Sequence, residues 1–394
     1  MAGDVPDFWK GTVLIGPVFP RFCVDLSPNL QLPSLFRGRV GFTRVSCGTG
    51  FDRHSLDRSV GEALERQFSF AEIRGGTSAG CLNELSDEIA NWFRVVFHDA
   101  NQQDIEDWQF SLTDILDRKS GGTIRAPVIP HTLGKHPDDR FMPIRDSSGC
   151  AFHTNVSQAE SGARIELYER QALTCFWYFG HVNAAVEVDK HYGLGFGSSI
   201  GGMLALLRLK GRIFLYDISL VRPHRVVLAA FVSDNDKVKF SSGAGSAQTF
   251  SDAACKAILE LYQAFVLMDQ LVDVTQRFKY SDEFTDGISR GYLASNTAEK
   301  SKVFIEVFDE NKVPSPVVDI KINWRGNLKD QRELVQLRSL KFGGKSTKLW
   351  FCSIHLVGGF PTMAPTERYP TATSIAAENY GYSQPLRAGP IPFG

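Results

Sequence analysis

The sequence predicts a mixed α/β fold in which mixed sheets are flanked by helices, and three observations support this prediction. Apolar runs rich in Val, Ile and Phe occur at Arg212–Ser219, 226–232 and Leu349–Val357, as is typical of buried strands. Apolar residues recur at helical spacing from residue 157 to 179 and from 255 to 266. The 394 residues are 43% hydrophobic and 22% charged, which is the composition of a globular protein with a large core.

The N-terminal part is predicted to contain strands, a glycine-rich turn and a helix. Strand-like runs cover residues 12–19 and Arg39–Val45. Ser46–Gly50 is predicted to be a tight turn before a helix at Ser59–Phe68. A Gly-x-Gly turn before a helix can bind phosphate, but a simple turn is the preferred interpretation because the motif is common. The next predicted elements are helices at Leu85–Phe97 and Ile105–Leu116 and a strand at Thr123–Ile129.

The glycines of residues 193–202 mimic a dinucleotide-binding fingerprint. The segment before them, 187–192, is a poor buried strand, so a loop and a helix cap are the preferred interpretation. From Gly358 onward the chain is rich in Pro and Gly, which predicts a tail held extended by its alternating prolines. The remaining predictions are a turn at Ser241–Ser246, a loop or lid at 280–300, strands at Val303–Phe308 and Val317–Trp324, and a short helix at Asp330–Leu337.

Paired glutamates on the central helix are the first sign of a site. Ser157 is a plausible N-cap, with Glu160 completing a capping box. Helical spacing then places Glu166 and Glu169 together on a helix that is otherwise apolar. Like charges at this spacing repel, and more strongly when desolvated. Stability alone does not explain the pair, so a positive ligand is expected in front of it.

The same arrangement occurs on two further helices. Glu62-x-x-Glu65-Arg66 repeats Glu166-x-x-Glu169-Arg170. A variant places Lys256, Glu260 and Gln263 on one stripe between apolar flanks. A single Glu-x-x-Glu-Arg is usually a solvated helix face. Two copies and a variant on apolar helices favour a shared site instead.

Glutamates from two helices form an oxygen-rich site suited to Mg²⁺ and not to zinc or copper. Neighbouring cationic side chains would bind an anion such as a nucleoside triphosphate. The sequence has no Walker A or kinase motif, so an ATP site would be of another type. A di-iron bundle requires Glu-x-x-His pairs, and these helices contain none.

Composition also limits the partners and the compartment. The net charge of −1 gives no electrostatic footprint for nucleic acid or an anionic membrane. No apolar run approaches the ~20 residues of a membrane span, and the acidic start is unlike a signal peptide. Seven scattered cysteines without a Cys-x-x-Cys pair favour a reducing compartment, so a cytoplasmic protein is expected.

Three motifs together resemble the ATP motifs of the YcaO family. Gly48-Thr-Gly with Ser59-Val-Gly-Glu62-Ala-Leu-Glu65-Arg66 resembles the first motif. Ser148-Gly-Cys-Ala-Phe with Glu166-Leu-Tyr-Glu169-Arg170 resembles the second, and Gly243-Ala-Gly with Lys256-Ala-Ile-Leu-Glu260-Leu-Tyr-Gln263 the third. The resemblance spans about residues 40–270. It is closest to the cyclodehydratase subunits of microcin-type thiazole/oxazole synthetases.

The resemblance implies a YcaO-type fold in which glutamate-bearing helices converge on Mg²⁺ and ATP. Residues 1–357 would form the ATP-binding catalytic domain, and 358–394 a tail that reaches the active site. The metal ligands would be Glu62, Glu65, Glu166 and Glu169. The nucleotide contacts would be Ser59, Arg66, Arg170, Lys256, Glu260 and Gln263. The catalytic end of the tail would be Pro392, Phe393 and Gly394.

The family resemblance also implies a reaction. A Cys, Ser or Thr side chain of a ribosomally made precursor peptide adds to the preceding backbone carbonyl. ATP phosphorylates the resulting oxyanion, and phosphate leaves to give a thiazoline or oxazoline. The implied partners are an E1-like leader-binding protein and a flavin (FMN) dehydrogenase. Thioamide or amidine formation and a non-catalytic scaffold are the alternatives.

The chain departs from the family pattern at four places. Arg58 stands where the first motif usually has Ser, and Thr49 where a Lys is common. Lys256 replaces an Arg that is frequent in the third motif, and the alternating proline tail is shortened to Gly-Pro-Ile-Pro-Phe-Gly. These departures concern the phosphate contacts of the first motif and the role of the tail.

Overall fold

The computed structural model describes most of the chain. In the strands between residues 21 and 50, and at parts of some helices, it describes the backbone alone. The described residues are 21–25, 34–40, 44–50, 53–70, 77–101, 105–188, 198–278, 293–313, 322–341, 348–363, 368–387 and 391.

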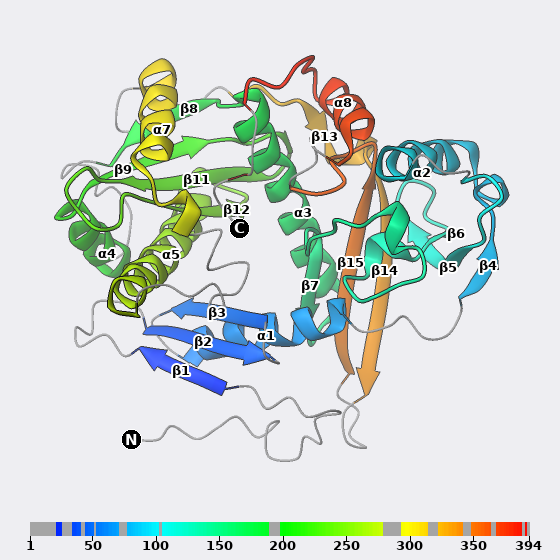
Figure 1. Ribbon diagram of the computed structural model, residues 1–394, viewed down its shortest axis with the longest axis horizontal. Helices are drawn as coiled ribbons and strands as arrows, with labels where there is room; N and C mark the ends of the chain where they lie inside the picture. Colours follow the sequence, from blue (N-terminus) through cyan, green and yellow to red (C-terminus); the bar gives the residue numbers. More distant parts are fainter. Residues whose placement is uncertain are drawn as a thin grey trace.

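Helices and strands alternate irregularly along the chain and form several sheets around a central helix, α3 (Figure 1). The α-helices are α1 (Arg53–Ser69), α2 (Asp87–Ala100), α3 (Val156–Phe179), α4 (Ser198–Arg208), α5 (Phe250–Phe278), α7 (Ala298–Asn311) and α8 (Pro370–Asn379). The strands are β1 (Arg21–Asp25), β2 (Ser34–Val40), β3 (Arg44–Gly50), β4 (Ser78–Gly80), β5 (Phe110–Asp117), β6 (Thr123–Pro127), β7 (Cys150–His153), β8 (Ala184–Glu187), β9 (Arg212–Asp217), β10 (Val221–Arg222), β11 (Arg225–Val232), β12 (Phe240–Ala247), β13 (Gly326–Asn327), β14 (Arg332–Lys341) and β15 (Lys348–Val357). The mixed α/β class is confirmed.

A four-stranded antiparallel sheet in the order β12-β11-β9-β8 separates two apolar cores. Because successive side chains of a strand point to opposite faces, Val227 and Ala229 of β11 join one core and Leu228 and Ala230 the other. The first core contains side chains of α4 and α5, and the second contains side chains of α3 and α7. The sheet is therefore covered by helices on both faces.

The second large sheet runs β4-β5-β14-β15-β7, with β6 paired to β5. Its core toward α2 and α8 contains Phe93, Phe97 and Phe110, and α3 lies against β7 and β15. The other sheets are small: β1-β2-β3 is antiparallel and β10 pairs with β13. Helix α3 is thus shared between the two main sheets, which explains why most of its residues from 167 to 179 are buried.

Helix α1 packs on β2 and β3 and also reaches the second sheet. Near its C-terminus the Phe68 ring stacks on Phe152 of β7 and on Phe351 of β15, with ring centroids 5.6 and 6.0 Å apart. Such aromatic contacts contribute about 0.5–1.5 kcal/mol each beyond the buried area. They fix the C-terminal end of α1 beside β7 and β15.

Two sequence predictions assign the wrong type of element. The helix predicted at Ile105–Leu116 is wrong, because Phe110–Asp117 is strand β5, paired with β4, β6 and β14. The strand predicted at Val303–Phe308 is also wrong, since it lies within α7. There Thr297 caps the helix by accepting from the Lys300 N–H, and Phe304, Val307 and Phe308 form a buried helical stripe. A short apolar run does not distinguish the period of a helix from that of a strand.

The helix predicted at Asp330–Leu337 is wrong as well. Only Leu328–Asp330 is helical, as one 3₁₀ turn, and β14 follows with ten residues paired to β15. The turns predicted at Ser46–Gly50 and Ser241–Ser246 lie in strands β3 and β12. In each case pairing with a distant strand overrides the local propensity.

The Pro/Gly-rich C-terminal segment is not extended throughout. Residues 370–379 form α8, whose Ala372, Ala376 and Ala377 are buried. The strands predicted at Arg212–Ser219, 226–232, Thr123–Ile129 and Leu349–Val357 are confirmed within a few residues, and so is the helix at Leu85–Phe97. The predictions for residues 12–19, most of 193–202 and 280–300, and most of Val317–Trp324 lie outside the described residues.

Candidate active site

Helices α1, α3 and α5 border the centre of the molecule in Figure 1 and carry the acidic stripes. Helix α3 begins where the Asn155 side chain accepts hydrogen bonds from the N–H groups of Ser157 and Gln158, at 2.9 and 3.1 Å. The N-cap is therefore Asn155, and the prediction of Ser157 is wrong. Glu160 completes no capping box, because its carboxylate pairs with Arg118 and Arg164.

Two glycines of β12 set the position of α5. A Cβ atom on Gly243 would lie 2.1 Å from the Leu261 backbone nitrogen, and one on Gly245 would lie 2.4 Å from the Ala253 oxygen. Such distances are impossible for real side chains, so only glycine lets the strand and the helix approach this closely. The glycines therefore act through packing and not as a turn.

Two site residues of α5 are held by the backbone of β12. The Glu260 Oε2 atom accepts a hydrogen bond from the Ala244 N–H at 3.3 Å. One turn earlier, Lys256 Nζ donates to the Ser246 carbonyl oxygen at 2.8 Å. Backbone groups of β12 thus orient both the carboxylate of Glu260 and the ammonium group of Lys256.

On α1 and α3 each pair of acids has an arginine four residues after its first member. Arg66 Nη2 lies 3.4 Å from Glu62 Oε1, and Arg170 Nη2 lies 3.7 Å from Glu166 Oε1. The Cys150 N–H of β7 also donates to Glu166 Oε2 at 3.1 Å. Each acid pair is therefore held by an arginine on its own helix, and Glu166 is also held by the strand that directly precedes α3.

The acids of α1 and α3 lie close enough to influence each other. Burial raises the pKa of Glu65 well above its usual value, and the charges of Glu166 and Glu62 raise it further. Burial likewise raises the pKa of Glu166 to about 7, although Arg170 and Arg66 oppose the rise. The two acidic stripes therefore share one electrostatic environment.

Helix α5 belongs to the same cluster. Burial and the charge of Glu169 raise the pKa of Glu260 to about 8. Burial also raises the pKa of Glu169, against the charges of Arg170 and Lys256. Arg170 lies among these carboxylates, whose charges raise its pKa although burial opposes the rise. The structure thus brings the acids and bases of all three helices together.

We expect the free energy of unfolding of the ligand-free chain to fall as the pH rises from 6.5 to 8. Folding raises the pKa of Glu166 from 4.5 to about 7 and that of Glu260 from 4.5 to about 8, so the folded chain binds more protons than the unfolded chain here. His131, His181, His224 and His355 have lowered pKa values, mainly through burial. They oppose this trend near pH 6.5, where an unfolded histidine is still partly protonated, and have little effect at pH 8. Chemical denaturation at several pH values measures the slope. A slope that Glu260→Gln leaves unchanged would contradict its assignment to these acids.

The cluster has the features of a site for a divalent cation and an anion. Its carboxylates outnumber its cations, and their raised pKa values favour the protonated form. A bound cation would lower these pKa values again. Buried polar atoms that have no partner among the described residues include Arg66 Nε and Ser148 Oγ. The side chains of Glu166 and Arg170 are 23% and 20% exposed, so a ligand can reach them.

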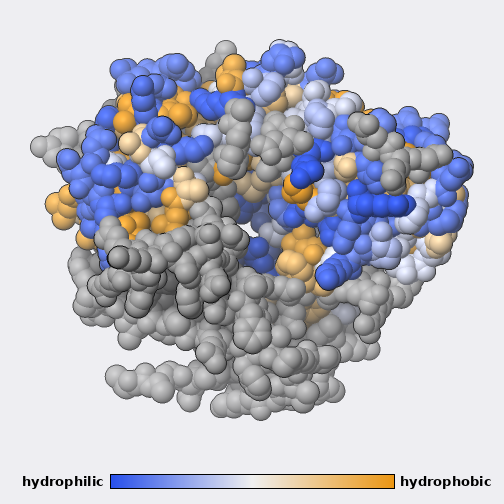
Figure 2. Space-filling model, viewed as in Figure 1, coloured by the Kyte–Doolittle hydropathy of each residue, from blue (hydrophilic) through white to orange (hydrophobic). Residues whose placement is uncertain are grey.

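The surface view agrees with this accessibility. Figure 2 shows the central face hollowed, with hydrophilic residues inside the recess. Among the described residues no three His, Cys, Asp or Glu side chains already form a metal-binding group. Mg²⁺ commonly takes only one or two protein carboxylates and completes its shell with water and phosphate oxygens, so the donor set fits that ion in company with a phosphate ligand.

Some predicted site residues are not placed by these contacts. Gln263 is half-buried, one turn after Glu260 on α5. Ser59 lies in α1, but its side chain is outside the described residues, as are Pro392, Phe393 and Gly394 entirely. The predictions for these residues stay predictions.

Asp146 is a site neighbour that sequence reasoning missed. Its charge raises the pKa values of both Glu166 and Arg170, so it lies near both. It precedes the Ser148-Gly-Cys-Ala motif by two residues in an irregular loop. A loop residue has no periodic pattern, and only its proximity to the motif could have drawn attention to it.

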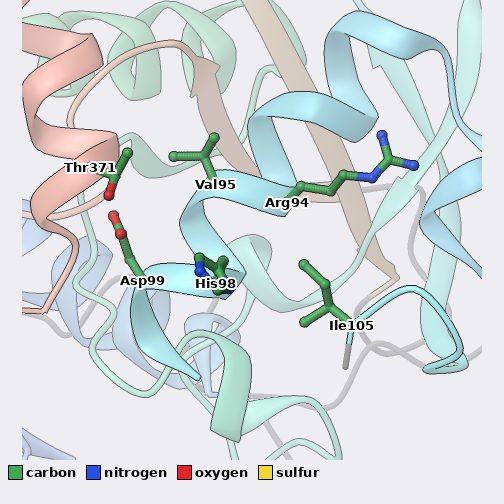
Figure 3. A pocket seen from close by; sticks show the side chains of 6 residues that line it. All are labelled: Arg94, Val95, His98, Asp99, Ile105 and Thr371. Carbon is green, nitrogen blue, oxygen red and sulfur yellow. The ribbon is translucent and has the colours of Figure 1, made fainter. Parts of the chain in front are cut away.

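A recess of about 250 Å³ between α2 and α8 lies apart from the acidic helices (Figure 3). Its polar side chains already have structural roles. Asp99 accepts a hydrogen bond from the Ala372 N–H at 2.8 Å near the start of α8, and Arg94 pairs with Glu106. These contacts already engage the two charged side chains of the recess.

The described cysteines and helices can be compared with the predictions about disulfides and membrane spans. Cys81, Cys150, Cys175, Cys255 and Cys352 are free thiols, and burial is the main cause that raises the pKa of Cys150. Cys150 is thus a buried small side chain. Within the described part of the chain, no helix has the length and hydrophobicity needed to span a bilayer.

Comparisons with known proteins identify the family and the fold. The family model "YcaO cyclodehydratase, ATP- and Mg²⁺-binding" matches residues 48–364. The microcin B17-processing protein McbD of Escherichia coli is 24% identical over 336 residues, which cover 83% of this chain and 80% of McbD.

Solved structures show the same fold. A chain of the E. coli microcin synthetase McbBCD complex with pro-MccB17 bound has a TM-score of 0.79 at 22% identity, covering 98% of this chain and 99% of that one. The YcaO protein of Methanopyrus kandleri bound with AMPPCP and Mg²⁺ has a TM-score of 0.59 at 13% identity, covering 88% of each chain. Because the family model spans most of the sequence, the chain belongs to the YcaO cyclodehydratase family, whose members bind ATP and Mg²⁺.

Proposed function

We propose that this chain is the cyclodehydratase subunit of a peptide-modifying synthetase. It converts Cys, Ser or Thr residues of a ribosomally made precursor peptide to thiazolines or oxazolines, and it consumes ATP. The observation that carries the proposal is the cluster of acids with raised pKa values shared by α1, α3 and α5. The similarity to McbD supports the azoline-forming branch of the family.

In this proposal the acids of α1 and α3 hold the metal, and the cations beside them hold the nucleotide. The metal ligands are Glu62, Glu65, Glu166 and Glu169, and the nucleotide contacts are Ser59, Arg66, Arg170, Lys256, Glu260 and Gln263. When bound, Mg²⁺ supplies positive charge that neutralises the triphosphate and the charge that develops during phosphoryl transfer. Arg170, held among several carboxylates, remains protonated and is oriented before the ligand arrives.

The need for ATP follows from the chemistry of the amide. Addition of the thiol or hydroxyl to the preceding carbonyl forms a C–S or C–O bond and leaves an oxygen that is a poor leaving group. Transfer of the γ-phosphoryl group to that oxygen converts it to phosphate. Loss of phosphate and of the amide N–H proton then gives the C=N bond of the azoline. The balance is one ATP consumed and one water removed from the peptide per ring.

Partners and location are part of the same proposal. The E. coli structure contains a synthetase complex with its precursor bound. By analogy, we assign this chain an E1-like leader-binding protein and an FMN-dependent dehydrogenase as partners. The five described free thiols agree with a reducing cytoplasm. The division into a catalytic domain of residues 1–357 and a tail of residues 358–394 that reaches the site also remains a proposal.

The purified chain, its partners and the precursor peptide, incubated with Mg²⁺ and ATP, are expected to give a peptide that has lost one water per ring. Mass spectrometry measures this loss, and omission of ATP is the control. An exchange of oxygen for sulfur would indicate thioamide formation instead. An unchanged peptide in the complete, ATP-containing mixture would favour a scaffold and contradict the proposal.

A further inference from the structure

Two side chains next to the acidic stripe of α3 hold the chain that follows β15. Gln171 directly follows Arg170, and its amide makes two hydrogen bonds with the backbone of Phe360. The Phe360 N–H donates to Gln171 Oε1 at 2.8 Å, and Gln171 Nε2 donates to the Phe360 oxygen at 3.0 Å. Gln171 is buried, so both bonds are shielded from water.

Asp146 holds the same segment three residues later. Its Oδ2 atom accepts a hydrogen bond from the Met363 N–H at 2.7 Å, and its Oδ1 atom accepts one from the Ser148 N–H at 2.9 Å. Asp146 therefore connects the C-terminal segment to the loop that leads into β7. The effect of its charge on Glu166 and Arg170 places it beside the acidic stripe.

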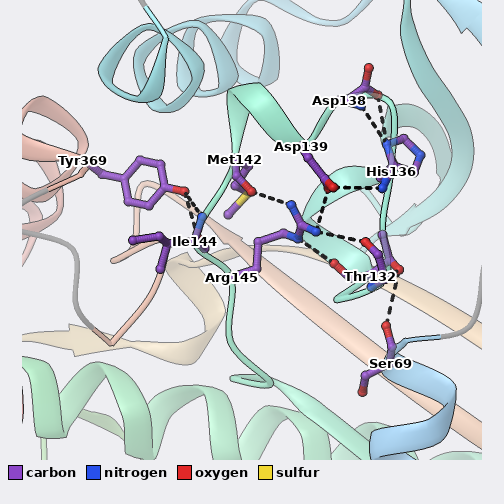
Figure 4. Close-up of polar contacts among 10 residues, drawn as sticks. Ser69, Thr132, His136, Asp138, Asp139, Met142, Ile144, Arg145 and Tyr369 are labelled. Atoms are coloured by element: carbon purple, nitrogen blue, oxygen red, sulfur yellow. Dashed lines mark hydrogen bonds and ion pairs between the residues drawn. The ribbon is translucent and has the colours of Figure 1, made fainter. Parts of the chain in front are cut away.

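The loop that carries Asp146 is itself rigidly held (Figure 4). Arg145 donates hydrogen bonds to the carbonyl oxygens of Thr132, Met142 and Gly134 and pairs with Asp139. The Thr132 hydroxyl in turn donates to the Ser69 carbonyl oxygen at the end of α1. Through these hydrogen bonds the loop connects the end of α1 to the C-terminal segment.

The segment reaches α3 through a turn that requires glycine. Gly358 has a φ of +77°, and a Cβ atom on Gly359 would lie 2.5 Å from Leu356 Cδ2. After the turn, Phe360, Pro361 and Thr362 are buried. The turn directs the chain against α3, where Gln171 and Asp146 hold it.

The rest of the described C-terminal chain follows the far end of α3. The Leu386 N–H donates to the Tyr178 oxygen at 2.6 Å, and Arg387 Nη1 donates to the carbonyl oxygens of Phe176 and Trp177. Ile391 packs against the core that α3 shares with the four-stranded sheet. The C-terminal segment is therefore attached to α3 at its middle and at its end.

We infer that Asp146 and Gln171 form a clamp on residues 360–363 and are positioning residues for azoline formation, which align the C-terminal segment with the acidic face of α3. This inference rests on the proposed function. Neither residue needs to touch the metal or the nucleotide. The clamp acts by fixing where the segment lies relative to Arg170 and Glu166, and a small displacement of reacting groups is costly in rate.

The test uses the full chain with its partners and two matched pairs of variants. Gln171→Met keeps the length of the side chain but removes both bonds to Phe360, and Gln158→Met makes the same change at an exposed position of α3. Asp146→Asn puts an amide donor opposite an N–H group, and Asp107→Asn makes the same change at an exposed loop position away from the clamp. The readouts are kcat, the KM for ATP, and hydrogen–deuterium exchange in residues 358–363 and 380–387.

Gln171→Met and Asp146→Asn are expected to lower kcat about tenfold or more, to leave the KM for ATP within about twofold, and to speed exchange in both segments. Both controls are expected to match the wild type. Asp146→Asn acts from the other side of the clamp and decides the question if Gln171→Met does not fold. Unchanged exchange, or faster exchange with unchanged kcat, would overturn the inference. If the wild type forms no azoline, the proposed function fails, while the exchange data still decide whether the clamp exists.

Discussion

Replacing Glu166 by Gln is expected to lower the rate of azoline formation by about 100-fold or more and at the same time to stabilise the ligand-free chain. The rate falls because a neutral amide cannot balance the charge of a divalent cation. Stability rises because Glu166, with a pKa of about 7, is unfavourable when ionised, and each pKa unit corresponds to about 1.4 kcal/mol. With partial exposure of the side chain, the gain at pH 8 is on the order of 1–3 kcal/mol. Glu169→Gln is expected to abolish activity in the same way.

Glu160→Gln is the matched control on the same helix. Glu160 faces away from the cluster and pairs with Arg164 at 2.8 Å and with Arg118. Loss of these charge-assisted contacts is expected to destabilise the fold by about 1–3 kcal/mol. The same substitution on one helix therefore has opposite effects on stability, according to whether the neighbouring cations outweigh the cost of burying the carboxylate among other acids.

Mass spectrometry of the peptide gives the rate, and thermal and chemical denaturation with and without Mg²⁺ and ATP give the stability. The stabilising effect of the ligands should largely disappear in Glu166→Gln. Full activity of both Glu166→Gln and Glu169→Gln would refute the metal assignment. A ligand-free Glu166→Gln variant that is less stable than the wild type would refute the electrostatic argument.

Gly243→Ala is expected to have the largest effect on the fold. Its new Cβ atom would lie 2.1 Å from the Leu261 nitrogen and 2.5 Å from the Glu260 carbonyl carbon, so α5 would have to move. Overpacking of this kind costs about 1–3 kcal/mol or more. Because Glu260 is held by the Ala244 N–H of the same strand, azoline formation should fall as well.

Gly201→Ala is the control for this variant. Gly201 lies within α4, and a Cβ atom there would meet nothing within 4 Å. Alanine favours helix over glycine by about 1 kcal/mol, so this variant should be as stable as the wild type or more so. Denaturation midpoints and peptide cyclisation measure both variants. Equal stability of Gly243→Ala and Gly201→Ala would show that the close approach of β12 to α5 is not required.

The sequence predicted the grouping of the acidic residues better than the type of the elements around them. The stripes Glu62–Glu65, Glu166–Glu169 and Lys256–Glu260 depend only on the period of the helix, and the structure groups these residues as expected. By contrast, β5 and β14 were predicted as helices. Their strand conformation depends on pairing with β4, β6 and β15, which local spacing does not reveal.

Asp146 and Gln171 show what periodicity does not detect. Asp146 lies in a loop, and Gln171 is one polar residue on a helix that contains many. Their partners, Met363 and Phe360, are 217 and 189 residues away along the chain, respectively. Only folding of the segment after β15 onto α3 gives either side chain its role.

By itself the sequence determined the mixed α/β class and the three acidic helices, and it predicted a hard cation with an anionic ligand beside them, because residue type and helical period are local properties. The tertiary structure decided which acids share one environment, how closely β12 approaches α5 and where the C-terminal segment attaches to α3. These outcomes depend on contacts between residues far apart in the chain, and such contacts exist only once the core has formed.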